Sequence, residues 1–238
     1  MSTTGAAIIL AAKERADLVG SGFISDAEWL RYVNGSCAEL HDLLIGAFGA
    51  DYKVQSTAGG YLVTTDGLTS YYALPADFYK LLGADLLISG SGESGTWQNL
   101  KPFNFSERNR YTGAGASNYP GRTNLRYRLN GSNLWLQPLP VSGLTVRVFY
   151  APLLAALDGT GGVADTFAGF SGWDEYAIVD AAIKGKVKAE EDPSALMAQK
   201  QALLQRIAAA AENRDAGSPA TVVDVTGYGR FEDGPEGW

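Results

Sequence analysis

The spacing of apolar residues divides the chain into three blocks, because helices repeat every 3.6 residues and half-buried strands every second residue. The first block, residues 1–51, has helical spacing. A helix is expected over about residues 4–19, and residues 25–48 predict one long amphipathic helix with Ser25 and Glu28 spaced as a capping box. The apolar stripe of this long helix consists of Trp29, Tyr32, Val33, Cys37, Leu40, Leu44, Ala47 and Phe48.

The second block, residues 52–151, alternates between apolar and polar positions. Short runs rich in aromatic and β-branched residues recur along it and predict antiparallel strands. These runs are YLVTT, SYYAL, DLLIS, LRYRL, LWLQP and TVRVFY. The clearest hairpin is LRYRLNGSNLWLQ, in which Asn130 and Gly131 are expected to supply the positive φ angles of a tight turn.

The third block, residues 152–216, returns to helical spacing. One helix is expected from about Trp173, and a second is expected to be capped by Asp192, to begin at Pro193 and to end near Asn213. Because almost no loop separates the two helices, they should pack as an antiparallel hairpin. Their apolar faces consist of Trp173, Tyr176, Ala177, Val179, Ile183 and Val187 in the first helix and Leu196, Met197, Leu203, Leu204 and Ile207 in the second.

Residues 217–238 contain too many glycines, prolines and acids to fold alone, and predict an extended C-terminal arm. A neighbouring chain should cover its apolar side chains, for example by accepting it as an added strand at an open sheet edge. Those side chains are Val222, Val223, Val225, Tyr228, Phe231 and Trp238. The sequence thus predicts an α+β protein: a four-helix antiparallel bundle from residues 1–51 and 152–216, an inserted antiparallel β domain at 52–151, and the arm.

Composition narrows the class of protein. A chain of 238 residues can bury a core large enough to be stable without a disulfide or a structural metal. Its single cysteine, Cys37, cannot form an internal disulfide, which suits assembly in a reducing cytoplasm. No apolar run approaches the ~18 residues that a membrane span needs. The early run AAIILAA has no basic residue before it and is followed by KER, which favours a helix over a signal peptide.

Charge is unevenly distributed along the chain. The formal net charge of -7 argues against a protein that coats nucleic acid. Residues 101–128 nevertheless carry a net charge of +5, which leaves -12 for the remainder. Within KPFNFSERNRY, residues 101–111, bases alternate with rings as in a nucleic-acid groove, although an acidic protein partner or a solvated loop would also suit them. The six bases of residues 101–128 are Lys101, Arg108, Arg110, Arg122, Arg126 and Arg128.

The sequence supports no catalytic or cofactor motif. GSGESG, residues 90–95, fits the dinucleotide fingerprint, but TWQNLKPF follows it instead of a helix, so it predicts a loop between strands. Cys37 and His41 stand one helical turn apart, yet the sequence has no further Cys or His to complete a zinc site. Asp174 and Glu175 suit the positive end of a helix. We therefore predict no enzyme, no cofactor and no metal.

Several segments, in this order, resemble the head-to-tail adaptor (connector, or head completion) proteins of tailed bacteriophages. The likeness spans about residues 3–225. The segments are FISDAEWLRYVNGSCAELHDLLIGAFGADY, YALPADFYKLLGADL, LKPFNFSERNRY, RYRLNGSNLWLQPLP and GWDEYAIVDAAIKGKVKAEED with the following LMAQKQALLQRIAAAAENRDAG. The resemblance implies a structural protein of the virion neck that is assembled in the host bacterial cytoplasm. It also implies an oligomeric ring, commonly a dodecamer, which sits beneath the portal, joins the DNA-filled capsid to the tail and continues the DNA channel.

The implied partners are neighbouring subunits, the portal protein and the next tail component, while DNA passes through without specific binding. The resemblance favours protein contact for the basic segment: Asn104 would cap a short turn near Phe105, with the rings under the sheet and the cations facing a partner. The expected partner interface combines the six bases with the apolar residues of the arm. The alternative is a nucleic-acid-binding protein that uses residues 101–128. A carbohydrate-active protein ranks last because the β block offers no suitable acid pair; its stacking rings would be Trp97, Tyr119, Trp135 and Tyr150.

Overall fold

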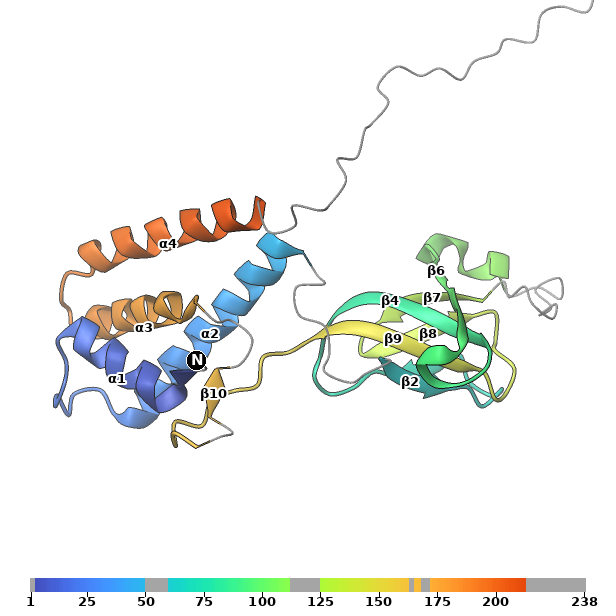
Figure 1. The fold of residues 1–238 in the computed structure, drawn as a ribbon, viewed down its shortest axis with the longest axis horizontal. Coiled ribbons are helices and arrows are strands. Elements are labelled where there is room, and N and C mark those ends of the chain that lie inside the picture. The colour runs from blue at the N-terminus through green and yellow to red at the C-terminus, as the bar shows by residue number, and fades with distance from the viewer. Residues whose placement is uncertain (1–2, 50–59, 112–124, 163–164, 168–171, 213–238) are drawn as a thin grey trace, which may run out of the picture.

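The computed structural model describes residues 3–49, 60–111, 125–162, 165–167 and 172–212. Within them the chain is a mixed α+β protein with four α-helices, two four-stranded sheets and a two-stranded ladder. The helices gather at one end of the molecule and the two larger sheets at the other (Figure 1). No helix in the described ranges is both long enough and apolar enough to cross a membrane.

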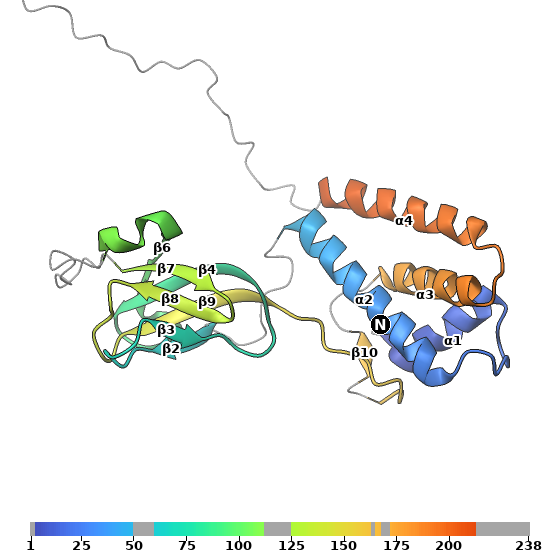
Figure 2. The same ribbon diagram turned by 180° about the vertical axis from the view of Figure 1, so that it is seen from behind.

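The four helices lie where the apolar spacing predicts them. They share one hydrophobic core, in which α3 contacts each of the other three. Helices α3 and α4 lie side by side and run in opposite directions (Figures 1 and 2), as their short connection predicts. The helices are α1 (Gly5–Ala16), α2 (Asp26–Phe48), α3 (Asp174–Lys188) and α4 (Ser194–Glu212).

Most of the predicted apolar stripe of α2 is buried. The side chain of Trp29 is fully enclosed, and a Cβ placed on Gly185 of α3 would lie 2.3 Å from its ring, so glycine is what lets the two helices approach. The predictions for Val187 and Met197 are wrong, since these side chains are 59% and 56% exposed. Val187 lies in the last turn of α3 and Met197 in the first turn of α4, and at these positions the predicted apolar face no longer points toward the core.

The predicted caps are confirmed at one helix and wrong at another. Asp192 accepts hydrogen bonds from the backbone N–H of Ser194 at 3.0 Å and from its hydroxyl at 2.8 Å, as expected of a capping residue. Ser25 precedes α2 but makes no side-chain capping bond. The carboxylate of Glu28 accepts hydrogen bonds from Tyr32 and Lys188 instead, because a partner on α3 competes for it.

A buried polar network joins α2, α3 and α4. Asp180 is 3% exposed, and its carboxylate accepts hydrogen bonds from the hydroxyl of Ser36 at 2.6 Å and from Lys200 at 2.8 Å. Lys184 pairs with it at 2.6 Å, and Lys200 also reaches Glu39 at 2.8 Å. Burial raises the pKa of Asp180, but these hydrogen bonds outweigh burial and hold that pKa below its ordinary value. The network fixes the rotation of three helices about their axes.

The two four-stranded sheets pack face to face around a second hydrophobic cluster, to which both contribute. The strand runs read from the alternating pattern are confirmed, with β4 longer than expected. In hydrogen-bonded order, the first sheet contains β2 (Tyr61–Thr64), β9 (Thr145–Pro152), β4 (Phe78–Ser89) and β5 (Thr96–Asn99). The second contains β3 (Tyr71–Ala73), β8 (Asn133–Gln137), β7 (Arg126–Asn130) and β6 (Lys101–Pro102).

Two details of the β prediction are wrong. Strand β6 pairs in parallel with β7, because a long connection through the 3-10 helix η3 (Phe105–Tyr111) brings the chain back in the same direction. In the β7–β8 hairpin, Asn130 is paired with Asn133 inside the ladder, so the turn is made by Gly131 and Ser132. Gly131 carries the positive φ, 58°, that the turn requires, whereas Asn130 does not.

A carboxylate that the sequence analysis did not single out fastens α1 to a distant loop. Asp165 is fully buried beside a short ladder of β1 (Thr3–Thr4) and β10 (Thr166–Phe167), which lies next to the helices in Figure 1. Its two carboxylate oxygens accept four backbone N–H groups at 2.8–3.0 Å, those of Ala6, Asp158, Gly159 and Gly161. A Cβ at Gly5 would lie 2.3 Å from this carboxylate, so only glycine fits there.

Candidate interaction surface

The second sheet carries a cluster of rings on the face turned away from the β core. Along β8, Leu134 and Leu136 belong to the core, so Trp135 between them points to the opposite face. Sheet register places Tyr71 of β3 and Arg128 of β7 on either side of Trp135. The Tyr71 ring stacks on Trp135 with centroids 5.3 Å apart and an interplanar angle of 17°.

The segment after β6 covers the other side of Trp135. Phe103 meets its ring edge-on at 5.0 Å and is 3% exposed, whereas Phe105 meets it at 6.0 Å and is 51% exposed. The expectation that the rings of this segment lie under the sheet is therefore met by Phe103 and wrong for Phe105. A short 3-10 helix does begin at Phe105, and the backbone carbonyl of Asn104 accepts a hydrogen bond from the Glu107 N–H at 2.9 Å.

Two arginines flank the exposed Phe105 ring. The guanidinium carbon of Arg108 lies 4.6 Å from the ring centroid, and that of Arg128 lies 5.8 Å from it. Each guanidinium also donates a hydrogen bond of 3.2 Å to a backbone carbonyl, Arg108 to Phe105 and Arg128 to Phe103. We name the surface formed by Tyr71, Lys101, Phe105, Arg108 and Arg128 the basic aromatic patch.

The two guanidiniums of this patch have no carboxylate partner within the described part of the chain, where Arg108 and Arg128 contact rings and backbone carbonyls instead. Elsewhere, many cations have an acidic partner within 3 Å: Lys13, Arg15, Arg147, Lys184, Lys186, Lys188 and Lys200. Two partly buried guanidiniums held over an exposed ring form a surface suited to an anionic or acidic aromatic partner.

The other basic residues of the expected interface are only partly placed. Lys101 is exposed on β6, and its register partner on β7 is Arg126, so the two lie next to each other at the edge of the sheet. Arg122, the side chain of Arg110 and all six apolar residues of the arm lie outside the described residues. The structure thus brings Lys101, Arg126 and Arg128 of β6 and β7 and Arg108 of the adjoining η3 into one region.

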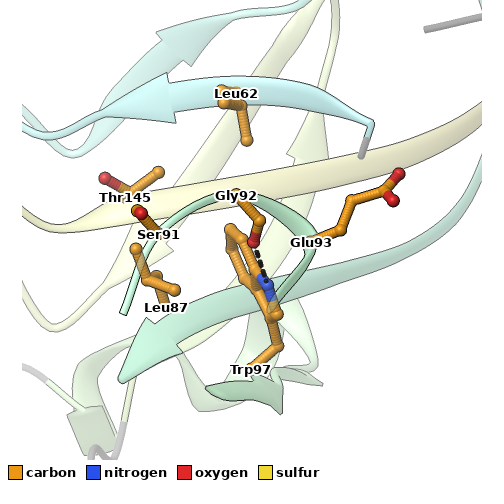
Figure 3. A pocket seen from close by; sticks show the side chains of 7 residues that line it. All are labelled: Leu62, Leu87, Ser91, Gly92, Glu93, Trp97 and Thr145. Carbon is orange, nitrogen blue, oxygen red and sulfur yellow. Dashed lines mark hydrogen bonds between the residues drawn. The ribbon is translucent and has the colours of Figure 1, made fainter. Parts of the chain in front are cut away.

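A small hollow opens on the outer face of the first sheet, and Figure 3 shows its lining. It has a volume of about 270 Å³, and its walls come from β2, β9, β4, β5 and the glycine-rich loop. That loop runs directly into β5, as predicted, with the 3-10 turn η2 (Gly92–Ser94) inside it and no helix to receive a pyrophosphate. The lining residues are Leu62, Leu87, Ser91, Gly92, Glu93, Trp97 and Thr145.

The ring of Trp97 is already engaged in this hollow. Its indole N–H donates to the carbonyl of Gly92 at 3.0 Å, and the guanidinium of Arg147, paired with Asp85 at 2.9 Å, lies 4.1 Å from the ring centroid. The rings considered for sugar stacking do not share one surface. Trp135 is 6% exposed on the other sheet, and Tyr150 is 5% exposed and donates to Asp77 at 2.8 Å, while Tyr119 lies outside the described residues.

Cys37 and His41 are both buried in the helical core. Burial raises the pKa of the Cys37 thiol to about 12, which is the environment of a packing residue, as predicted. The His41 ring meets Tyr79 of β4 edge-on at 5.2 Å, and the Tyr79 hydroxyl donates to Asp42 at 2.7 Å, so α2 contacts the β sheets here. Nowhere in the described ranges do three Cys, His, Asp or Glu side chains gather closely enough to hold a metal ion.

The class of protein follows from the comparison with protein families, in which the model of the SU10 adaptor protein family matches residues 3–223. The chain belongs to this family, whose members are structural head-tail adaptors of bacteriophages and are not known as enzymes. No curated protein sequence matches the chain.

Proposed function

We propose that this protein forms a ring, with twelve copies as the expected number, beneath the portal of a tailed bacteriophage. The ring joins the DNA-filled capsid to the tail and continues the DNA channel. Its partners are neighbouring copies, the portal protein and the next tail component, and its place is the neck of a virion assembled in the bacterial cytoplasm. The observation that carries the proposal is the family match, which extends over residues 3–223.

The proposed division of labour follows the fold. Residues 1–51 and 152–216 form the body of the ring as an antiparallel four-helix bundle, the β domain at 52–151 reaches toward a partner, and residues 217–238 act as an arm. The distribution of charge supports a channel in the body. Outside residues 101–128 the chain has a net charge of -12, and like charge keeps the phosphates of passing DNA from adhering.

The test is assembly on purified portal complexes, followed by electron microscopy of the ring. The unaltered chain should form closed rings that extend the portal channel. Replacing Arg108 and Arg110 with Glu should block assembly, because the reversed charge would repel an acidic docking surface. Chains that never add to portal complexes at any concentration would refute the adaptor role.

A second candidate is nucleic-acid binding by the basic aromatic patch. The observation in its favour is the pair of guanidiniums over the exposed Phe105 ring, which also suits phosphate and base stacking. Binding to short DNA fragments that weakens steeply with salt would support it. If particles with Arg108→Glu and Arg110→Glu assembled normally but failed to retain or eject DNA, this candidate would replace the docking role of the segment.

A further inference from the structure

The chemistry of the basic aromatic patch indicates a ligand with two features. Arg108 and Arg128 have no carboxylate among the described residues, so the ligand should be acidic. The half-exposed rings of Phe105 and Tyr71 lie between and beside these cations, so the ligand should also carry rings or other apolar groups. A segment in which acids alternate with aromatic residues satisfies both requirements.

The sequence of this chain contains such a segment. Residues 231–238, FEDGPEGW, hold three acids and no base, with an aromatic residue at each end. We call them the acidic arm end. The two sequences are complementary in both respects: KPFNFSERNRY carries three bases and one acid among its rings, and FEDGPEGW carries the opposite charge among its own.

The arm has enough length to reach beyond its own molecule. The last described helix, α4, ends at Glu212, and the arm end begins at Phe231. At about 3.3 Å per residue, the intervening chain can extend over roughly 60 Å, which exceeds the diameter of a small domain. An arm of this length can therefore contact another copy while α4 stays in its own helical core.

We propose that the acidic arm end of one copy docks on the basic aromatic patch of the neighbouring copy. Arg108 and Arg128 then pair with Glu232 and Asp233, while Phe231 and Trp238 pack on the exposed rings of the patch. Because patch and arm are different surfaces, their contact is heterologous, and repeated heterologous contacts close into a ring. The choice of a neighbouring copy rests on the proposed ring.

The first test measures binding of a fluorescent peptide of residues 231–238 by anisotropy. The receptor is the full chain carrying Glu232→Gln, Asp233→Asn and Glu236→Gln, so that its own arm does not compete. The peptide should bind and should weaken as salt is raised, because exposed charges are screened. Adding Arg108→Gln and Arg128→Gln to the receptor should weaken binding about tenfold.

Matched controls separate this contact from nonspecific attraction. Arg206→Gln removes an arginine that lies 5.0 Å from the Trp173 ring in the helical region, and binding should not change. A peptide with its three acids replaced by their amides should lose as much affinity as the Arg108→Gln, Arg128→Gln receptor does. Unchanged thermal unfolding of that receptor would show that the loss comes from the patch and not from misfolding.

Two results would overturn the proposal. One is equal binding of the charged and amide peptides, or of the receptors with and without Arg108 and Arg128. The other is absence of peptide binding together with tight, salt-dependent binding of a short DNA duplex that disappears in the Arg108→Gln, Arg128→Gln receptor. The second result would assign the patch to nucleic acid.

Photo-crosslinking distinguishes a neighbouring copy from the same copy. The full chain with Trp238→p-benzoylphenylalanine is mixed with an isotopically heavy chain, assembled on portal complexes and irradiated. Crosslinks from heavy to light chains at residues 101–108 support docking between copies, and crosslinks within single chains only refute it. If rings form but no heavy-to-light crosslinks are found, this inference is refuted and the proposed function still stands. Peptide binding without any ring would refute the proposed function, and with it the choice of a neighbouring copy, but would still show that the patch binds the acidic arm end.

Discussion

Replacing Asp165 with Asn should loosen the junction between α1 and the loop at residues 158–165. Each carboxylate oxygen of Asp165 accepts two backbone N–H groups, Asp158 and Gly159 on one and Ala6 and Gly161 on the other. Asparagine keeps the shape of the side chain and one acceptor oxygen. Its NH₂ group would face two N–H donors that it cannot satisfy, and the bonds at the remaining oxygen would lose the contribution of charge.

The expected magnitude follows from these four bonds. Hydrogen bonds to a charged group contribute about 1.5–3 kcal/mol each, and two are lost while two are weakened. Water can reach part of this loop, since Asp158 and Gly161 are exposed, so the lower end of the range applies. We expect the free energy of unfolding to fall by about 3 kcal/mol, which lowers the Tm by roughly 6–12 °C for a chain of this size.

The effect should depend on pH in a defined direction. Burial raises the pKa of Asp165, but the backbone N–H donors outweigh burial and hold that pKa below its ordinary value. The unfolded state therefore binds its proton first as the pH falls. The stabilisation is complete above about pH 4, the ordinary range of an Asp carboxyl, and is lost as the pH falls through the folded pKa. The difference in Tm between the original chain and Asp165→Asn should shrink accordingly.

Thermal unfolding followed by circular dichroism at the helical minimum provides the assay. Asp158→Asn in the same loop is the matched control: Asp158 is exposed and accepts only local hydrogen bonds from Thr160, which an amide oxygen can also accept. Its Tm should change little, since such surface substitutions stay within about 0.5 kcal/mol. Equal melting of the two variants would show that the four N–H groups find other partners, and would refute the argument.

Three further predictions concern the helical core. Gly185→Ala places a Cβ against the enclosed Trp29 ring, and urea unfolding should show a loss of about 1–3 kcal/mol; an unchanged midpoint would mean that the ring can move away. Lys200→Met leaves Asp180 with one fewer cation and should lower the free energy of unfolding by about 3 kcal/mol. A second substitution, Asp180→Asn, should restore part of this loss in a double-mutant cycle. Strictly additive losses would contradict the coupling. Cys37, with its raised thiol pKa, should stay unreacted with a thiol reagent at about pH 8 in the folded protein and react fully in guanidinium, whereas rapid labelling of the folded chain would contradict its burial.

The sequence was sufficient for the long elements because their burial follows a simple period. Residues 26–48 form one helix because Trp29, Val33 and Leu40 recur on one side, and the structure buries that side. The short strands β1, β6 and β10 were not predicted. Each has only two residues, so no period can be recognised in it, and its pairing depends on where the fold brings a partner.

The candidate surface was visible only in part. Bases and rings alternate within residues 101–111, so the basic segment could be recognised. Trp135 and Tyr71 join it through sheet register, which a local pattern does not encode. The role of Asp165 could not be predicted for a related reason. In the sequence it is one acid in a glycine-rich loop, and the four backbone N–H groups that it accepts come together only in the folded chain. The capping box of Ser25 and Glu28 was predicted wrongly because Glu28 binds Lys188 of α3, and a partner so distant in the sequence cannot be recognised from the local pattern.

The division of one helical core between the two ends of the chain sets an order of folding. Helices α1 and α2 bury their apolar sides mainly against α3, which the ribosome makes only after the whole β region. Strands β2 to β9 are contiguous and can fold as soon as they emerge, whereas the first two helices must wait for contacts of long sequence separation. During synthesis, their unpaired apolar stripes are the surfaces most exposed to aggregation and to chaperone binding.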